Sequence, residues 1–183
     1  MPTPNAGAAK QGSQQIRLSW SGGGTNGRPL DHLEIRVDGG GWENVGTASG
    51  SRVVGNGYNQ THSIQVRAFD TAGQVSGITS ASATTDAPAA AVTVSRGSSA
   101  VGQPNCSHSS CAYIKVDLTN FAPNTTVTCN AINTSTGPIP GSFTVSTDGS
   151  GRGSRQSSAY FGYPTGRVEV TCGGVTGRRD PWV

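Results

Sequence analysis

The four cysteines are the residues of this chain best suited to do chemistry, and all of them lie between Cys106 and Cys172. An even number of cysteines in a strand-rich sequence is typical of disulfides, which form in oxidising compartments. The first hundred residues contain no cysteine. This uneven placement predicts two modules, of which only the second is disulfide-bonded, and an extracellular or cell-surface location.

The positions of the cysteines favour one pairing among the three that four cysteines allow. Cys129 and Cys172 each fall on the apolar face of a predicted strand, which favours a bridge between the two sheets of a sandwich. Cys106 and Cys111 enclose a polar loop that can turn back on itself. We therefore predict Cys106–Cys111 and Cys129–Cys172. The longer bridge should contribute about 3–4 kcal/mol by closing its loop in the unfolded chain.

Zinc binding is the alternative use of the first two cysteines. Cys106, His108 and Cys111, with one distant cysteine, would supply four ligands. Structural zinc sites favour two paired ligand knuckles, and this chain has a single irregular one. We therefore prefer disulfides and expect no cofactor and no metal.

An aromatic cluster is the second feature with binding potential. It runs Tyr160-Phe161-Gly162-Tyr163-Pro164, and its glycine and proline interrupt a regular strand, so we expect at least one exposed ring. Such a cluster either closes one end of a sandwich or offers a stacking platform for a sugar or a protein. The complete set of candidate binding residues is Tyr160, Phe161, Tyr163, Trp42, Arg152 and Arg155.

Charged residues are unevenly distributed along the chain, and the two arginines of this set lie in the more basic half. Residues 1–86 carry six basic and six acidic residues, whereas residues 87–183 carry seven against four, which accounts for the net charge of +3. Because the arginines are dispersed, a solvated surface is the simpler interpretation. A site for an anionic polymer is the alternative.

Composition and patterning predict an all-β protein. Gly 27, Pro 10 and Met 1 argue against helices and favour short strands joined by tight turns. No run approaches the roughly twenty apolar residues of a membrane helix. The start of the chain also lacks the charged and apolar regions of a signal peptide, so we expect a fragment of a longer secreted protein.

Alternation of polar and apolar residues places the strands. The clearest are 15–20, 33–37, 63–69, 113–118, 126–131 and 167–172, with turns at 38–41, 70–73 and 148–151. Trp20 lies on an apolar strand face and is expected in the core. For His32 and His62 we expect no neighbouring carboxylate or cysteine that would suggest a ligand, and we expect both on strand surfaces.

Residues 1–86 resemble a fibronectin type III domain. The resemblance rests on Trp20, the 26–30 loop, the 33–37 strand and the segment 66–76. One position departs from the family, because His62 stands where a tyrosine usually pins a corner of the fold; Tyr58 could substitute. Residues 87–183 resemble a disulfide-bonded immunoglobulin-like module. The resemblance implies two tandem antiparallel β-sandwiches, fibronectin type III-like and then immunoglobulin-like.

Catalytic motifs are missing from the sequence: it has no GxSxG, no paired-carboxylate region and no phosphate loop, so we expect no enzymatic activity. The tandem resembles the C-terminal region of actinobacterial multi-domain surface proteins, through 26–29, 72–76 and 160–164. This resemblance implies a non-catalytic extracellular binding or spacer pair that contacts protein or cell-wall polysaccharide. We expect no nucleic-acid partner, and membrane attachment only through other parts of the parent protein.

Two other functions fit the same sequence. One is an accessory region, spacer or carbohydrate-binding, of a secreted polysaccharide hydrolase. The other is a structural subunit of a virion or surface filament. The sequence leaves open the ligand, the parent architecture, the oligomeric state and the glycosylation of four Asn-x-Ser/Thr sequons, at Asn59, Asn105, Asn124 and Asn133.

Overall fold

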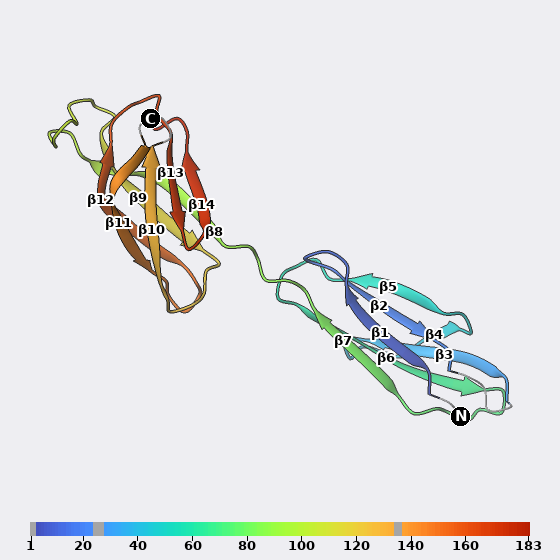
Figure 1. The fold of residues 1–183 in the computed structure, drawn as a ribbon. Helices are drawn as coiled ribbons and strands as arrows, with labels where there is room; N and C mark the ends of the chain where they lie inside the picture. Colours follow the sequence, from blue (N-terminus) through green and yellow to red (C-terminus); the bar gives the residue numbers. More distant parts are fainter. Residues whose placement is uncertain (1–2, 24–27, 134–136) are drawn as a thin grey trace. The chain divides into compact units, whose positions relative to one another are not determined.

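A computed structural model describes residues 3–23, 28–133 and 137–183 (Figure 1). Within these ranges the regular structure consists of antiparallel strands in four sheets, and no helix is present. The all-β sandwich prediction is therefore confirmed. The chain divides into two compact units, Met1–Pro88 and Ala89–Val183. No helix in the described ranges is long and apolar enough to cross a membrane.

The first unit packs a three-stranded sheet, ordered β1-β2-β5, against a four-stranded sheet, ordered β4-β3-β6-β7. Its strands are β1 (Asn5–Lys10), β2 (Ile16–Ser21), β3 (Leu30–Val37), β4 (Glu43–Gly46), β5 (Gly50–Val54), β6 (Thr61–Asp70) and β7 (Thr79–Thr84). Trp20 packs against a core made of alternate residues of the inner strands. These buried residues are Ile16, Leu18, Leu33, Ile35, Ile64, Val66 and Ala68. Burial of each large aliphatic side chain contributes about 1.5–3 kcal/mol.

The turn between β3 and β4 is a tight reverse turn that the sequence predicted. Asp38 and Gly39 both have positive φ, 49° and 73°, and the Gly40 N–H donates to the Val37 carbonyl at 2.9 Å. Hairpin turns of this type favour Asp-Gly because glycine adopts positive φ without steric cost. The Asp38 carboxylate accepts the backbone N–H of Ser63 at 2.7 Å, which ties the turn to β6.

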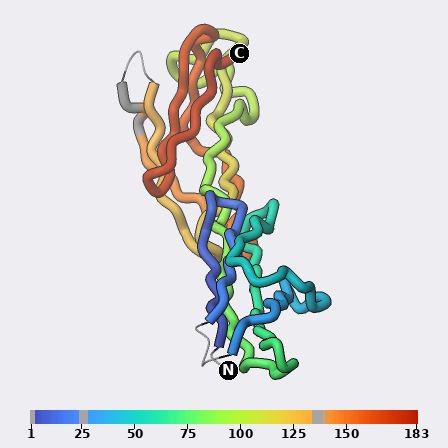
Figure 2. Tube along the Cα trace, turned by 90° about the vertical axis from the view of Figure 1, so that its right-hand side faces the viewer, coloured from blue at the N-terminus to red at the C-terminus, as the bar shows by residue number. Residues whose placement is uncertain are grey.

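The second unit packs the sheet β11-β10-β13-β14 against the sheet β12-β9-β8 (Figures 1 and 2). Its strands are β8 (Ala91–Ser99), β9 (Ala112–Thr119), β10 (Thr126–Asn133), β11 (Gly137–Ser146), β12 (Gly153–Phe161), β13 (Val168–Cys172) and β14 (Val175–Arg179). Buried aliphatic residues from both sheets make one core, which also contains Phe161, the Cys129–Cys172 bridge and Trp182.

The Cys129–Cys172 disulfide joins neighbouring strands of one sheet. The two cysteines are direct partners in the β10–β13 ladder, with Cα atoms 4.1 Å apart. This short spacing is typical of residue pairs that do not hydrogen-bond to each other across an antiparallel ladder. The predicted pairing is present, but the predicted bridge between two sheets is wrong. Two inward-facing cysteines look the same in sequence whether their strands are neighbours or face each other.

The Cys106–Cys111 disulfide closes the loop between β8 and β9. Its sulfurs are buried with Ala100 in a small separate cluster that packs against Tyr113 and Tyr160. The zinc alternative required both sulfurs as thiolate ligands, and the bridge uses them. Two disulfides fit an oxidising, extracellular environment.

Trp182 is a core residue that the sequence analysis did not identify. Its side chain is completely buried, and its indole Nε1 donates to the Ser110 carbonyl at 3.0 Å. Its ring also meets Phe161 edge-on, with centroids 5.7 Å apart. Trp182 therefore connects the loop closed by the Cys106–Cys111 disulfide, and the end of β12, to the main core.

Candidate functional site

A groove of about 360 Å³ opens at one end of the second unit, and we call it the aromatic groove. Three segments that are distant in sequence line it: 104–106 from the disulfide loop, Ile139 from β11, and 158–163 from the end of β12 and beyond. The fold therefore brings the three predicted aromatic residues together in one groove wall.

An irregularity in β12 shapes this wall. Gln156 pairs with Lys115 and Tyr160 pairs with Tyr113, so the three residues 157–159 lie opposite one residue of β9. The buried Ser157 hydroxyl holds this bulge, because it accepts the Ala159 N–H at 3.2 Å and lies 3.1 Å from the Ala159 carbonyl, to which it donates. Bulges of this kind redirect side chains, and here Ser158 and Ala159 line the groove.

The three aromatic side chains have different roles. Phe161 is 6% exposed and belongs to the core, whereas Tyr163 is 67% exposed. Their ring centroids lie 5.7 Å apart at an interplanar angle of 52°, so the buried ring supports the exposed one. Tyr160 is half-buried, and its hydroxyl donates to the Pro104 carbonyl at 3.0 Å. Tyr163 is therefore the ring that the groove presents to a ligand.

The short disulfide loop forms part of the groove and also contacts the aromatic segment directly. The Ser110 hydroxyl donates to the Gly162 carbonyl, and Trp182 binds the Ser110 carbonyl from the core side. A Cβ atom at Gly162 would lie 2.5 Å from the Cys111 sulfur. Only glycine permits this close approach, which explains the glycine within the aromatic cluster.

Trp42 lies in the first unit, on the outer side of the four-stranded sheet. The guanidinium carbons of Arg36 and Arg67 lie 4.9 Å and 4.2 Å from its ring centroid. Arg67 also pairs with Glu34, with Nε 2.7 Å from the carboxylate. Trp42 is half-buried in a cation–π cluster and is not part of the aromatic groove.

Arg152 and Arg155 also lie outside the aromatic groove. Arg152 ends the turn before β12, eight residues before Tyr160, and lines a different pocket together with Asp117 and Asp148. The Arg155 guanidinium donates to the Thr144 carbonyl at 2.7 Å and lies 3.2 Å from its hydroxyl. Arg155 thereby joins the edge strands β12 and β11 of the two sheets, which is a structural role.

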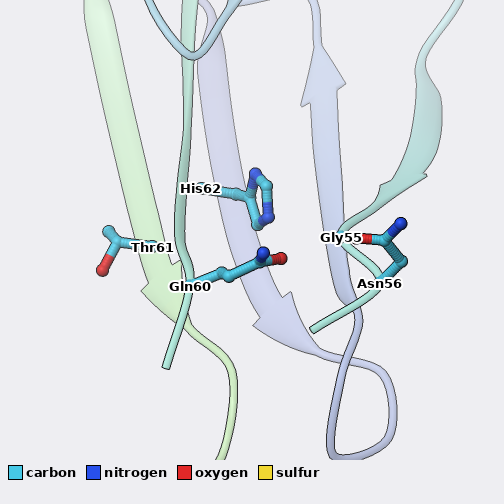
Figure 3. A pocket seen from close by; sticks show the side chains of 5 residues that line it. All are labelled: Gly55, Asn56, Gln60, Thr61 and His62. Atoms are coloured by element: carbon cyan, nitrogen blue, oxygen red, sulfur yellow. The ribbon is translucent and has the colours of Figure 1, made fainter. Parts of the chain in front are cut away.

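A second, open pocket of about 670 Å³ lies in the first unit, where β5 ends and β6 begins (Figure 3). His62 lines it, and its Nδ1 lies 2.7 Å from the Asp38 carboxylate. Burial raises the pKa of Asp38, but hydrogen bonds from His62 and Ser63 outweigh burial and hold the pKa below its ordinary value. The expectation that His32 and His62 have no carboxylate neighbour is wrong. Folding brings the turn at Asp38, 24 residues away, beside His62, and the Asp31 carboxylate lies 2.7 Å from Nδ1 of His32.

The second ring nitrogen of His62 has no nucleophile within hydrogen-bonding distance among the described residues. His62 Nε2 is buried and forms no hydrogen bond there, and a Cβ at Gly55 would lie 3.0 Å from it. Thr61, the lining residue with a hydroxyl, points away from the pocket and lies 2.8 Å from Thr84 (Figure 3). Among the described residues this aspartate–histidine pair therefore lacks the adjacent hydroxyl or thiol of a nucleophilic triad.

The described residues contain no group of three or more metal-binding side chains. The lining of the aromatic groove combines aromatic rings with a serine hydroxyl and an asparagine amide, which suits binding by stacking and hydrogen bonding. Comparisons with protein-family models and with curated proteins found no match to this chain.

Proposed function

We propose that this chain is a non-catalytic extracellular module pair of a bacterial cell-surface protein, with a fibronectin type III-like module followed by an immunoglobulin-like one. The second module binds a protein or a cell-wall polysaccharide through the aromatic groove. The observation that supports this most directly is Tyr163, an exposed ring at the groove wall that contacts the buried ring of Phe161.

The construction of the groove favours binding over catalysis. The described side chains in its lining include no carboxylate, imidazole or amine that could transfer a proton. Its walls are held by a disulfide, a bulge and a buried tryptophan, so little ordering is needed when a ligand arrives. Preorganisation of this kind raises affinity because less conformational entropy is lost on binding.

An accessory region of a secreted polysaccharide hydrolase is the second candidate function. The same observation favours it, since an exposed tyrosine beside uncharged polar groups is suited to a sugar chain. Under this alternative the protein would bind the isolated polysaccharide that its enzyme degrades and would not bind intact bacteria.

Binding of the labelled, disulfide-intact protein to intact bacteria, purified cell walls and plant or chitin polysaccharides tests the proposal. We expect wild type and Y58A to bind cells or walls, and Y163A to bind about tenfold more weakly. Tyr58 is a matched control because it is an exposed tyrosine of the first unit, 41% exposed. Equal binding by Y163A, or no binding to any bacterial surface, would contradict a surface-binding role for the groove.

A further inference from the structure

We infer that the aromatic groove binds an uncharged glycan chain, with one sugar ring stacked on Tyr163 and the neighbouring hydroxyls bound by Asn105 and Ser158. This inference rests on the proposed function and adds the chemical class of the ligand.

The lining matches an uncharged ligand. None of the described side chains that line the groove carries a charge at neutral pH. A charged ligand placed there would lose hydration without gaining an opposite charge, which is unfavourable. Ligands whose recognition depends on carboxylate or phosphate groups are therefore disfavoured at this site.

Tyr163 provides the surface for a sugar ring. The electron-rich face of an aromatic ring attracts partly positive hydrogens, such as the C–H groups on one face of a pyranose. Tyr163 is 67% exposed, and Phe161, 5.7 Å away between ring centroids, sets its position. A ring held in this way can stack on a ligand with little loss of side-chain entropy.

Two polar side chains are available beside this ring. Asn105 and Ser158 are both exposed and line the groove, and neither side chain hydrogen-bonds to another described residue. An amide and a hydroxyl together offer donors and acceptors, as the hydroxyl groups of a sugar require. Asn105 has a φ of 59°, a left-handed conformation at the turn that precedes Cys106. Both groups are fixed to rigid elements, the disulfide loop and the bulge.

A peptide ligand that adds a strand to the sheet is disfavoured at the same place. Strand addition needs unpaired N–H and C=O groups along an edge strand. At the bulge of β12, the Ser157 hydroxyl bonds both backbone groups of Ala159. The edge facing the groove therefore lacks the regular pattern of free groups that an extended peptide would pair with.

Titration of the full chain with cellohexaose and chitohexaose, followed by NMR or calorimetry, tests the inference. Polygalacturonate serves as the charged comparison. We expect at least one neutral oligosaccharide to bind, with little change between about 50 and 500 mM salt because no ion pair is involved. Y163A should weaken binding about tenfold, and N105A and S158A about threefold each. Y163F should retain binding, since stacking does not need the hydroxyl, and Y58A should match wild type.

Three outcomes would overturn the inference. The first is binding of polygalacturonate alone, weakened by salt, and the second is undiminished oligosaccharide binding by Y163A with native circular dichroism. The third points to a protein ligand. If the protein binds cells through Tyr163 but binds neither neutral oligosaccharide, and protease treatment of the cells abolishes binding, the ligand is a protein. In that case the glycan inference fails and the proposed surface-binding function stands.

Discussion

Asp70 and Asp148 occupy the same position in two copies of one five-residue turn, one copy in each unit. In each turn the aspartate Oδ1 accepts the backbone N–H groups two and four residues later, at 2.9 and 2.9 Å for Asp70 and at 2.8 and 3.0 Å for Asp148. The fourth residue is a glycine with a φ of 76° or 73°. The aspartate N–H closes both turns by donating to the carbonyl of the fifth residue, at 3.0 and 2.8 Å.

These two turns make stability depend on pH in the acid range. The Gln74 N–H lowers the pKa of Asp70, and the Ser150 hydroxyl lowers the pKa of Asp148. Because the folded pKa lies below the unfolded value of about 3.9, each carboxylate stabilises the fold above that pH. The stabilisation is lost as pH falls through the folded pKa.

We expect the urea concentration at the midpoint of unfolding to decrease at pH values below about 4. D70N and D148N should make this decrease smaller. Denaturation curves at pH values from about 2 to 7 measure it. D180N, at an exposed carboxylate outside these turns, is the control. An unchanged acid dependence in D70N/D148N would show that other carboxylates dominate.

The glycines of the two turns should respond differently to substitution. Both have positive φ, so alanine adds about 1 kcal/mol of backbone strain at either position. A Cβ at Gly73 meets no atom within 4 Å, whereas a Cβ at Gly151 collides with the Phe121 carbonyl. We therefore expect G73A to cost about 1 kcal/mol and G151A about 3 kcal/mol or more. Chemical unfolding measures both, and equal losses would contradict the predicted collision.

The two disulfides should affect stability and binding differently. Loop-closure entropy gives about 4 kcal/mol for Cys129–Cys172, which spans 43 residues, and about 2 kcal/mol for Cys106–Cys111, which spans five. We expect C129A/C172A to lower the unfolding free energy more than C106A/C111A. The short-bridge variant should instead lose most ligand binding, because its loop forms one groove wall. Full binding by a folded C106A/C111A protein would exclude that role.

Trp182 should contribute strongly to the stability of the second unit. W182A removes a fully buried ring, and we expect a loss of about 3–5 kcal/mol. W182F keeps most of the volume but leaves the Ser110 carbonyl without its indole donor, which should cost about 1–2 kcal/mol. Thermal unfolding with near-ultraviolet circular dichroism separates the two variants. A W182F protein as unstable as W182A would show that the hydrogen bond, not the volume of the buried ring, is limiting.

The strands outside the six clearest alternating segments all lie at the edges of sheets: β1, β4, β5, β7, β8, β11, β12 and β14. Central strands such as β3, β6 and β9 bury a full row of aliphatic residues, which makes the period of two clear in sequence. An edge strand contacts one neighbour and buries less, so serine, threonine, arginine and glycine suffice there. β12, which carries part of the groove, is such a strand.

Sequence alone determined the β class, the inner strands and the principal turns, because these depend on the local order of residue types along one segment. It also predicted which cysteines pair, from the apolar strand faces on which Cys129 and Cys172 lie. Only the tertiary structure decided that Cys129 and Cys172 lie on neighbouring strands, that Asp38 contacts His62, and which segments meet in the groove. Alternation shows which face of a strand is buried. Which strands become neighbours depends on the packing free energy of the whole sandwich, and no single segment records it.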